Sequence, residues 1–396
     1  MGGDGRIRAA GHEHSARPTV VAESGRLLRL DGLRAIAIGM VFLQHVHGVP
    51  LFWSGVDLFF VLSGYLITGI LLRTRRQPNY FRNFYARRTL RIFPAYYIVL
   101  AVAVLVLPAT RSMAGWAAGY AGNVWVALNT DHNALGHLWS LAVEEQFYLL
   151  WPLAILFCPV RRRWWLIGTA IVGAWIARGL SVGFGSWFAA YTLLPCRMDG
   201  LAIGAALALV EFNRGRHVLV AARRWLLPCA LASGLLFVAT ARVFPWLSVG
   251  YGTVCLGLSV MFYGFLLAWV LSLSNNSPVV RILSWRPVTY VGQISYGLYL
   301  FHLPVIYWLG QWYAKGSVAL ILLASVLTLA LSMVSWYLIE KPINRHKHRF
   351  QSAAVPAVPS SDDDATLERR PTDAAVSAFH DAIPRQHDGR AVSPQS

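Results

Sequence analysis

Long apolar stretches alternate with short polar linkers along most of the chain. Ten of these stretches are long enough to cross, or nearly cross, a bilayer as a helix of about 20 residues. They lie near residues 30–50, 53–72, 92–109, 138–158, 164–180, 197–212, 225–241, 249–271, 288–309 and 317–339. The pattern predicts an all-α integral membrane protein with about ten transmembrane helices in one bundle.

The linkers on the two sides of this predicted bundle differ in positive charge. Basic linkers lie before residue 30 and near 73–91, 161–163, 214–224, 281–286 and 341–349. The alternate linkers hold only Arg111, Arg178, Arg197, Arg242 and Lys315. Because cytoplasmic linkers carry the excess of Lys and Arg, we expect both termini to be cytoplasmic.

Composition agrees with a membrane protein and limits what the basic charge can mean. The 396 residues are 56% hydrophobic and 13% charged, whereas a soluble globular protein carries about 25% charged residues. The net charge of +17 follows the linker topology, so nucleic acid is not an expected partner. The four cysteines have no CxxC spacing, and we expect neither a metal site nor a disulfide framework.

The two ends of the chain are polar. Residues 1–26 are basic and residues 346–396 are rich in Ala, Pro, Ser and Asp, so both are expected to be disordered cytoplasmic segments. Residues 27–345 form the expected transmembrane domain. The N-terminal segment lacks the short apolar core of a signal peptide, so the first apolar stretch is expected to be retained.

Two polar residues interrupt the first apolar stretch at a helical spacing. In a helix, Arg34 and His45 are separated by about 16 Å along the axis and by nearly three full turns. Their side chains therefore lie on one face, about half a bilayer apart. We interpret them as two positions along one path.

Ionisable side chains inside the predicted helices converge near one depth. On the topology above, the outer part of five helices holds His45, Asp57, Glu144, Glu145, Arg197, Asp199 and His302, with Tyr296 close by. Ionisable groups inside a membrane are costly and indicate functional sites by default. Asp57, Arg197 and Asp199 can equally form a structural ion-pair network, and His302 can equally serve structure or substrate contact.

A second basic cluster lies on the predicted cytoplasmic side. Arg88 and Arg91 are three residues apart on an expected interfacial helix and face the same way. A guanidinium pair of this kind suits a polyphosphate, because guanidinium groups bind phosphate bidentately. Contact with lipid headgroups is the alternative interpretation.

Seven short motifs, in order, resemble those of the acyltransferase-3 family of integral-membrane O-acyltransferases. They are LDGLR at 30–34 followed by His45, GVDLFFVLSG at 55–64, RTLRIFP at 88–94, WSLAVEEQFY at 139–148, RMDG at 197–200, ISYGLYLFH at 294–302 and EKP at 340–342. The resemblance implies ten spanning helices, acyl-CoA (often acetyl-CoA) as donor and a hydroxyl acceptor, usually on a sugar of a cell-envelope glycan or of a glycosylated metabolite. It also implies a multi-pass protein of the bacterial cytoplasmic membrane. The chain offers no stretch for the extracytoplasmic hydrolase-like domain that some relatives carry.

The resemblance and the estimated depths together suggest roles for these residues. Arg34, Arg88 and Arg91 are expected to hold the CoA phosphates. His45 is expected to be the general base on the acceptor hydroxyl, because imidazole titrates near neutrality, and Glu144 or Glu145 to orient it. Acceptor contacts are expected at Asp57, Arg197, Asp199, Tyr296 and His302. Acyl-CoA is then a co-substrate, and no permanently bound cofactor is expected.

A polytopic transporter of a small polar substrate is the alternative from another class, because transporters also place polar residues inside the bundle. The sequence shows no inverted repeats, and the ionisable layer lies away from the centre of the predicted membrane. Both features favour the acyltransferase.

Overall fold

A computed structural model describes residues 18–129, 133–346 and 350 of the chain. These residues form helices and connecting turns, and they contain no β-strand. Most of the two segments expected to be disordered, 1–26 and 346–396, lies outside the described residues. The first helix begins at Pro18, within the first of those segments.

Ten helices of 15 residues or more build the described bundle. They are α1 (Pro18–Val46), α2 (Gly55–Thr74), α3 (Tyr80–Val106), α6 (Leu138–Phe157), α7 (Arg163–Gly183), α9 (Leu194–Arg214), α10 (His217–Val243), α11 (Leu256–Ser272), α14 (Ser295–Leu309) and α15 (Val318–Ser335). Short helices fill the connections: α4 (Arg111–Ala118), α5 (Gly122–Asn129), α8 (Trp187–Thr192), α12 (Pro278–Leu283), α13 (Arg286–Gln293) and α16 (Lys341–Arg345). The predicted all-α fold is confirmed.

Eight helical segments of the described chain are long and apolar enough to span a membrane. Large apolar side chains such as Leu105, Leu235 and Val326 are exposed on them, as lipid-facing side chains are. The expected spans 30–50 and 288–309 are not among the eight. The apolar part of α1 carries Arg29, Asp31 and Arg34, and α14 has only 15 residues because the chain turns at Ile294.

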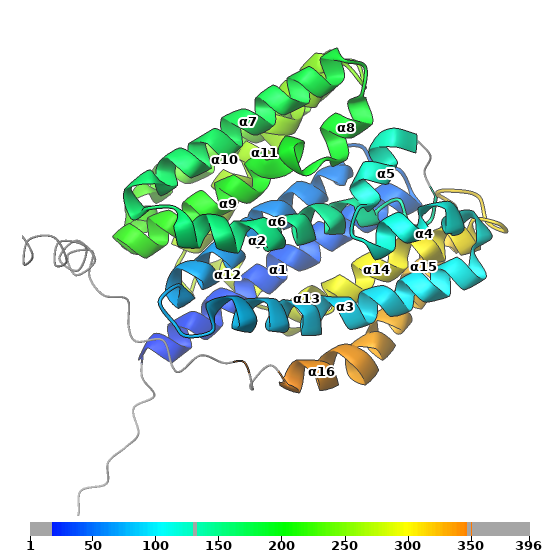
Figure 1. The fold of residues 1–396 in the computed structure, drawn as a ribbon, viewed down its shortest axis with the longest axis horizontal. Coiled ribbons are helices and arrows are strands. Elements are labelled where there is room, and N and C mark those ends of the chain that lie inside the picture. The colour runs from blue at the N-terminus through cyan, green and yellow to red at the C-terminus, as the bar shows by residue number, and fades with distance from the viewer. Residues whose placement is uncertain (1–17, 130–132, 347–349, 351–396) are drawn as a thin grey trace, which may run out of the picture. The chain divides into compact units, whose positions relative to one another are not determined.

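The central helices of the bundle carry Arg34, His45, Asp57, Glu144 and Glu145. Figure 1 shows α1, α2 and α6 between α7, α10 and α11 on one side and α3, α14 and α15 on the other. Helix α9 packs against both α2 and α7, and α1 packs against α2, α13 and α14. The helices with polar residues therefore lie next to one another.

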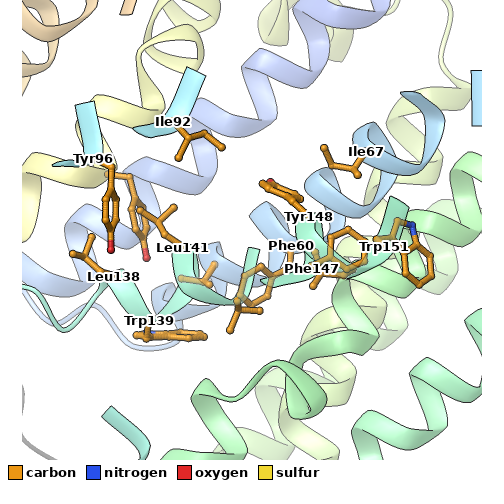
Figure 2. Packing of buried hydrophobic residues seen from close by; sticks show 14 of the residues in the cluster. Phe60, Ile67, Ile92, Tyr96, Leu138, Trp139, Leu141, Phe147, Tyr148 and Trp151 are labelled. Carbon is orange, nitrogen blue, oxygen red and sulfur yellow. The ribbon is translucent and has the colours of Figure 1, made fainter. Parts of the chain in front are cut away.

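Aromatic and aliphatic side chains fill the space between α2, α3 and α6. Figure 2 shows Phe60 of α2 and Phe147 and Trp151 of α6 in one cluster of buried side chains. The rings of Phe147 and Trp151 are stacked, with centroids 5.0 Å apart. This packing fixes the rotation of α6, and so the direction in which its polar residues point.

Helices α2 and α9 approach unusually closely because two glycines meet the opposite backbone. A Cβ atom added at Gly64 would lie 1.9 Å from the carbonyl oxygen of Leu201, and one at Gly204 would lie 2.1 Å from that of Val61. Small residues allow such approaches between membrane helices. The contact places α9 directly against the polar face of α2.

Two buried ion pairs connect α9 to α2 and to α7. Arg197 of α9 pairs with Asp57 of α2, which also accepts a hydrogen bond from Ser259 of α11 at 2.7 Å. Asp199 of α9 pairs with Arg178 of α7 at 2.7 Å. All four charged side chains are almost completely buried. We placed Arg178 in a linker, but α7 extends to Gly183 and carries it into the bundle.

Substituting Gly64 by Ala is expected to lower the free energy of unfolding by about 1–3 kcal/mol, the usual cost of overpacking. The new methyl group meets backbone that cannot rotate away. Denaturant unfolding of the purified protein in detergent measures the change. Gly168→Ala on α7 is the matched control, because nothing lies within 4 Å of a Cβ there and Ala is the better helix former. Equal stability of the two variants contradicts the close approach.

Asp57→Asn is expected to lower the free energy of unfolding by about 3–5 kcal/mol, because Arg197 is then an uncompensated buried charge. The same unfolding measurement applies. The double variant Asp57→Leu/Arg197→Met removes both charges and should recover most of the loss. A double variant less stable than Asp57→Asn would show that the two residues do not act as a pair.

Candidate functional site

The three arginines expected to hold the CoA phosphates line one cavity of about 80 Å³. Arg34 comes from α1, and Arg88 and Arg91 come from α3; Glu144 and Glu145 of α6 line it too. We call it the arginine cavity. Cationic and carboxylate groups therefore meet where α1, α3 and α6 converge.

Helix α3 delivers its two arginines without the break that we expected. The sequence predicts Arg88 and Arg91 on an interfacial helix ahead of the span near 92–109. In the structure Pro94 lies inside the single helix α3. Helices that span membranes tolerate an internal proline when neighbouring groups satisfy the backbone.

Glu144 is held at the wall of the arginine cavity. Ser63 donates a hydrogen bond to Glu144 Oε1 at 2.6 Å, and the Tyr148 hydroxyl donates to Ser63 Oγ at 3.1 Å. The guanidinium of Arg88 lies 5.0 Å from the centroid of the Tyr148 ring. This chain of contacts sets the carboxylate and the guanidinium in fixed positions.

A second basic cavity of about 120 Å³ adjoins the first. It is lined by Arg87, Asn83 and Thr74, and it shares Arg88 and Arg91 with the arginine cavity. The two arginines thus contribute to both spaces. Together the two cavities form a positively charged route into the bundle.

A larger cavity, of about 360 Å³, is lined by His45 and His137 and by aromatic side chains, including Trp187 and Tyr191. We call it the histidine cavity. Val56 of α2 and Tyr299 of α14 line both this cavity and the arginine cavity. The two cavities are therefore neighbours, separated by a wall to which these two side chains contribute.

The ring beside His45 belongs to His302, which lies fully buried behind it. His302 Nδ1 lies 2.6 Å from the Tyr299 carbonyl and can only donate to it, so in a neutral ring Nε2 is the acceptor. That Nε2 lies 3.3 Å from His45 Nδ1, which is also 2.9 Å from the Val41 carbonyl. Both contacts favour a proton on His45 Nδ1 and a lone pair on its Nε2.

His137 is a site residue to which the sequence analysis gave no role. It directly precedes α6, and its ring lies 4.9 Å from that of His302 and 5.4 Å from that of Tyr299. Burial is the main cause that lowers the pKa of His137 to about 3, so it is neutral at physiological pH. No sequence motif identifies it, because its partners come from the distant helix α14.

The predicted layer of ionisable residues is brought together only in part. His45 and His302 meet, whereas Glu144 and Glu145 line the neighbouring arginine cavity. We paired His45 with one of these glutamates, but the hydrogen bond that the structure gives Glu144 comes from Ser63. Tyr296, expected at the acceptor, lines the arginine cavity and donates to the Ile92 carbonyl at 2.8 Å.

The remaining expected acceptor contacts form the buried ion pairs of α9. Among the residues described as lining the arginine and histidine cavities, none is Asp57, Arg197 or Asp199. The guanidinium of Arg197 instead lies between aromatic rings, 5.3 Å from the centroid of Tyr191 and 5.8 Å from that of Trp139. This geometry favours the structural interpretation. Arg197 thus contacts Tyr191 and Trp139, and these two rings line the histidine cavity.

Within residues 18–129, 133–346 and 350, no group of three His, Cys, Asp or Glu side chains is arranged to hold a metal ion.

Comparison with known proteins adds an independent line of argument. An acyltransferase-domain model, that of the acyltransferase-3 family, matches residues 27–337. O-acetyltransferase OatA of Staphylococcus aureus (strain NCTC 8325 / PS 47) is 29% identical over 354 residues, covering 80% of this chain and 57% of its own. The putative peptidoglycan O-acetyltransferase YrhL of Bacillus subtilis (strain 168) is 32% identical over 372 residues, covering 82% and 56%.

Peptidoglycan O-acetyltransferase OatA of Listeria monocytogenes is 32% identical over 312 residues, covering 70% of this chain and 49% of its own. The chain thus spans about half the length of these curated relatives. No solved structure matches. The family model covers the motifs from 30–34 to 294–302, and the chain belongs to the acyltransferase-3 family.

Proposed function

We propose that the protein is a membrane O-acyltransferase of the bacterial cytoplasmic membrane. It moves an acetyl or other short acyl group from acyl-CoA to a hydroxyl of a sugar in a cell-envelope glycan. Family membership supports the reaction class, and the names of two relatives suggest peptidoglycan as the glycan. The observation that carries the proposal is the succession of cavities from Arg87 to His45.

The basic and arginine cavities suit the phosphates of CoA. Arg34, Arg88 and Arg91 line a single space, and guanidinium groups bind phosphate bidentately with charge-assisted hydrogen bonds. With both termini cytoplasmic, as the charge of the linkers indicates, this end faces the supply of acyl-CoA. The thioester then lies towards the wall at Val56 and Tyr299.

His45 acts as the general base in this proposal. Its Nε2 takes the proton of the acceptor hydroxyl while the hydroxyl oxygen attacks the thioester carbonyl carbon. The new ester C–O bond forms and the C–S bond breaks. The CoA thiolate leaves and takes the proton from His45 Nε2. His302 is a positioning residue, because its Nε2 accepts from His45 Nδ1 and keeps the other nitrogen basic.

Glu144 and Glu145 act from the neighbouring cavity. A carboxylate there favours the positively charged form of His45 electrostatically. It also compensates part of the arginine charge when no donor is bound. In this proposal Asp57, Arg197 and Asp199 keep the role of positioning the helices, and Tyr296 contacts the donor.

His45→Ala is expected to lower kcat about 10²–10⁴-fold, the usual contribution of a positioned general base. The assay measures labelled acetyl transfer from acetyl-CoA to soluble peptidoglycan glycan strands by purified full-length protein. His47→Ala is the matched control, since His47 is an exposed histidine just beyond the same helix. If the His45 variant transfers at the rate of wild type, His45 is not the base. A wild type that transports a solute but transfers no acetyl group favours the transporter.

Arg91→Ala and Arg88→Ala are each expected to raise the KM for acetyl-CoA roughly tenfold to hundredfold. The estimate corresponds to the loss of a charged hydrogen bond of about 1.5–3 kcal/mol. Initial rates at varied acetyl-CoA and saturating glycan give this value. Arg223→Ala, on the exposed surface of α10, tests whether any lost positive charge has the same effect. Unchanged KM in both cavity variants would remove the phosphate assignment.

A further inference from the structure

We infer that the histidine cavity binds one pyranose ring of the acceptor glycan, with Asn133, His137 and Trp187 as its hydrogen-bonding side chains. The inference rests on the proposed function and deepens it by naming the residues that select the acceptor. The cavity of about 360 Å³ lies in the size range of small-ligand pockets, about 300–1,000 Å³.

By hydrogen-bond geometry, three buried side chains of this lining carry polar atoms that have no partner among the described residues. These atoms are Nδ2 of Asn133, both ring nitrogens of His137 and Nε1 of Trp187. The three side chains are 4%, 3% and 6% exposed, respectively. A buried polar group without a partner is costly, and native proteins keep few of them. Three in one cavity indicate a ligand that supplies the missing hydrogen bonds.

The protein fixes the direction of these groups before any ligand arrives. Asn133 Oδ1 accepts a hydrogen bond from the Leu135 backbone at 2.8 Å, so its Nδ2 is the amide atom left to donate. The Trp187 ring stacks on that of Tyr191, with centroids 5.1 Å apart, and its centroid lies 4.5 Å from that of the Trp246 ring. Such preorganisation lowers the entropic cost of binding.

The chemistry of the lining fits a sugar. Asn133 and Trp187 donate, and the neutral imidazole of His137 both donates and accepts, which matches hydroxyl groups that do both. Trp53 and Tyr191, also in the lining, offer aromatic surface to the C–H face of a pyranose. The described lining contains Lys315 and no carboxylate, so an oxygen-rich ligand that is neutral or anionic fits better than a cation.

The location of the cavity links binding to the proposed chemistry. His45 lines the same space, so a hydroxyl of the bound ring comes next to the proposed base. Asn133 and His137 precede α6, and Trp187 begins the short helix α8. These are connecting segments outside the seven family motifs, and connecting segments commonly carry specificity on a rigid scaffold.

The test compares Trp187→Phe and His137→Phe with wild type, using full-length protein, labelled acetyl-CoA and soluble peptidoglycan glycan strands. Each variant keeps an aromatic ring and loses its hydrogen-bonding nitrogens. We expect the KM for the glycan to rise about threefold to tenfold in each, as for the loss of one neutral hydrogen bond, with the KM for acetyl-CoA unchanged. Trp165→Phe is the matched control, because Trp165 is 76% exposed on α7.

The outcomes separate the inference from the proposed function. A wild type that transfers no acetyl group to any glycan overturns the proposed function. A wild type that transfers, with an unchanged glycan KM in both variants, overturns the sugar subsite alone. A change in preferred acyl-chain length, without a change in glycan KM, assigns the cavity to the acyl group instead. Unfolding midpoints near that of wild type confirm that a variant is folded, and the two variants test the subsite separately.

Discussion

The buried pair of Asp57 and Arg197 is the interaction on which the arrangement of the site depends. It joins α2 to α9 about two helical turns before the close approach at Gly64. Val56, the neighbour of Asp57 in the chain, lines both the arginine and the histidine cavities. Ser63, two turns further along α2, holds Glu144. An α2 helix displaced along or around its axis would therefore alter both cavities together.

The site divides its polar groups between two environments with different chemistry. The arginine cavity combines guanidinium and carboxylate groups, which suit an anionic donor and balance one another in its absence. The histidine cavity combines imidazole, amide and indole groups with aromatic walls and Lys315, which suit an oxygen-rich acceptor that is not a cation. Tyr299 contributes to both, and its hydroxyl donates to the His137 carbonyl at 3.0 Å. The geometry thus matches a reaction between two unlike substrates that meet at one wall.

Much of the fold could be predicted from the sequence, because apolar length and periodicity determine which segments become helices. The placement of Arg34 and His45 in different cavities also agrees with their separation along one helix. Which side chains meet was harder to predict. The sequence indicates the depth of a residue in the membrane, but not the rotation of each helix about its axis. Glu144 and His45 were assigned similar depths, yet α6 presents Glu144 to Ser63.

Contacts between distant helices explain the other differences. The meeting of His45 and His302 requires α1 and α14 to pack together, and nothing local in either segment encodes it. The short helices α4, α5 and α8 were not expected, because helices of this length depend on tertiary packing rather than on their own propensity. His137, Asn133 and Trp187 come from these connecting regions, and their importance is visible only once the cavity is formed.

The shared wall at Val56 and Tyr299 has a consequence for the energetics of the cell. A bacterial cytoplasmic membrane carries an electrical potential, and a charge that crosses it dissipates about 2.3 kcal/mol per 100 mV. In the proposed function the two cavities open to opposite sides of the membrane, and a passage wide enough for a thioester is also wide enough for water and protons. The Ser140 hydroxyl lies 2.6 Å from the Tyr299 hydroxyl and holds the Tyr299 side chain in place. In the proposed function, Val56 and Tyr299 therefore admit the acyl group and also limit the leak of protons between turnovers.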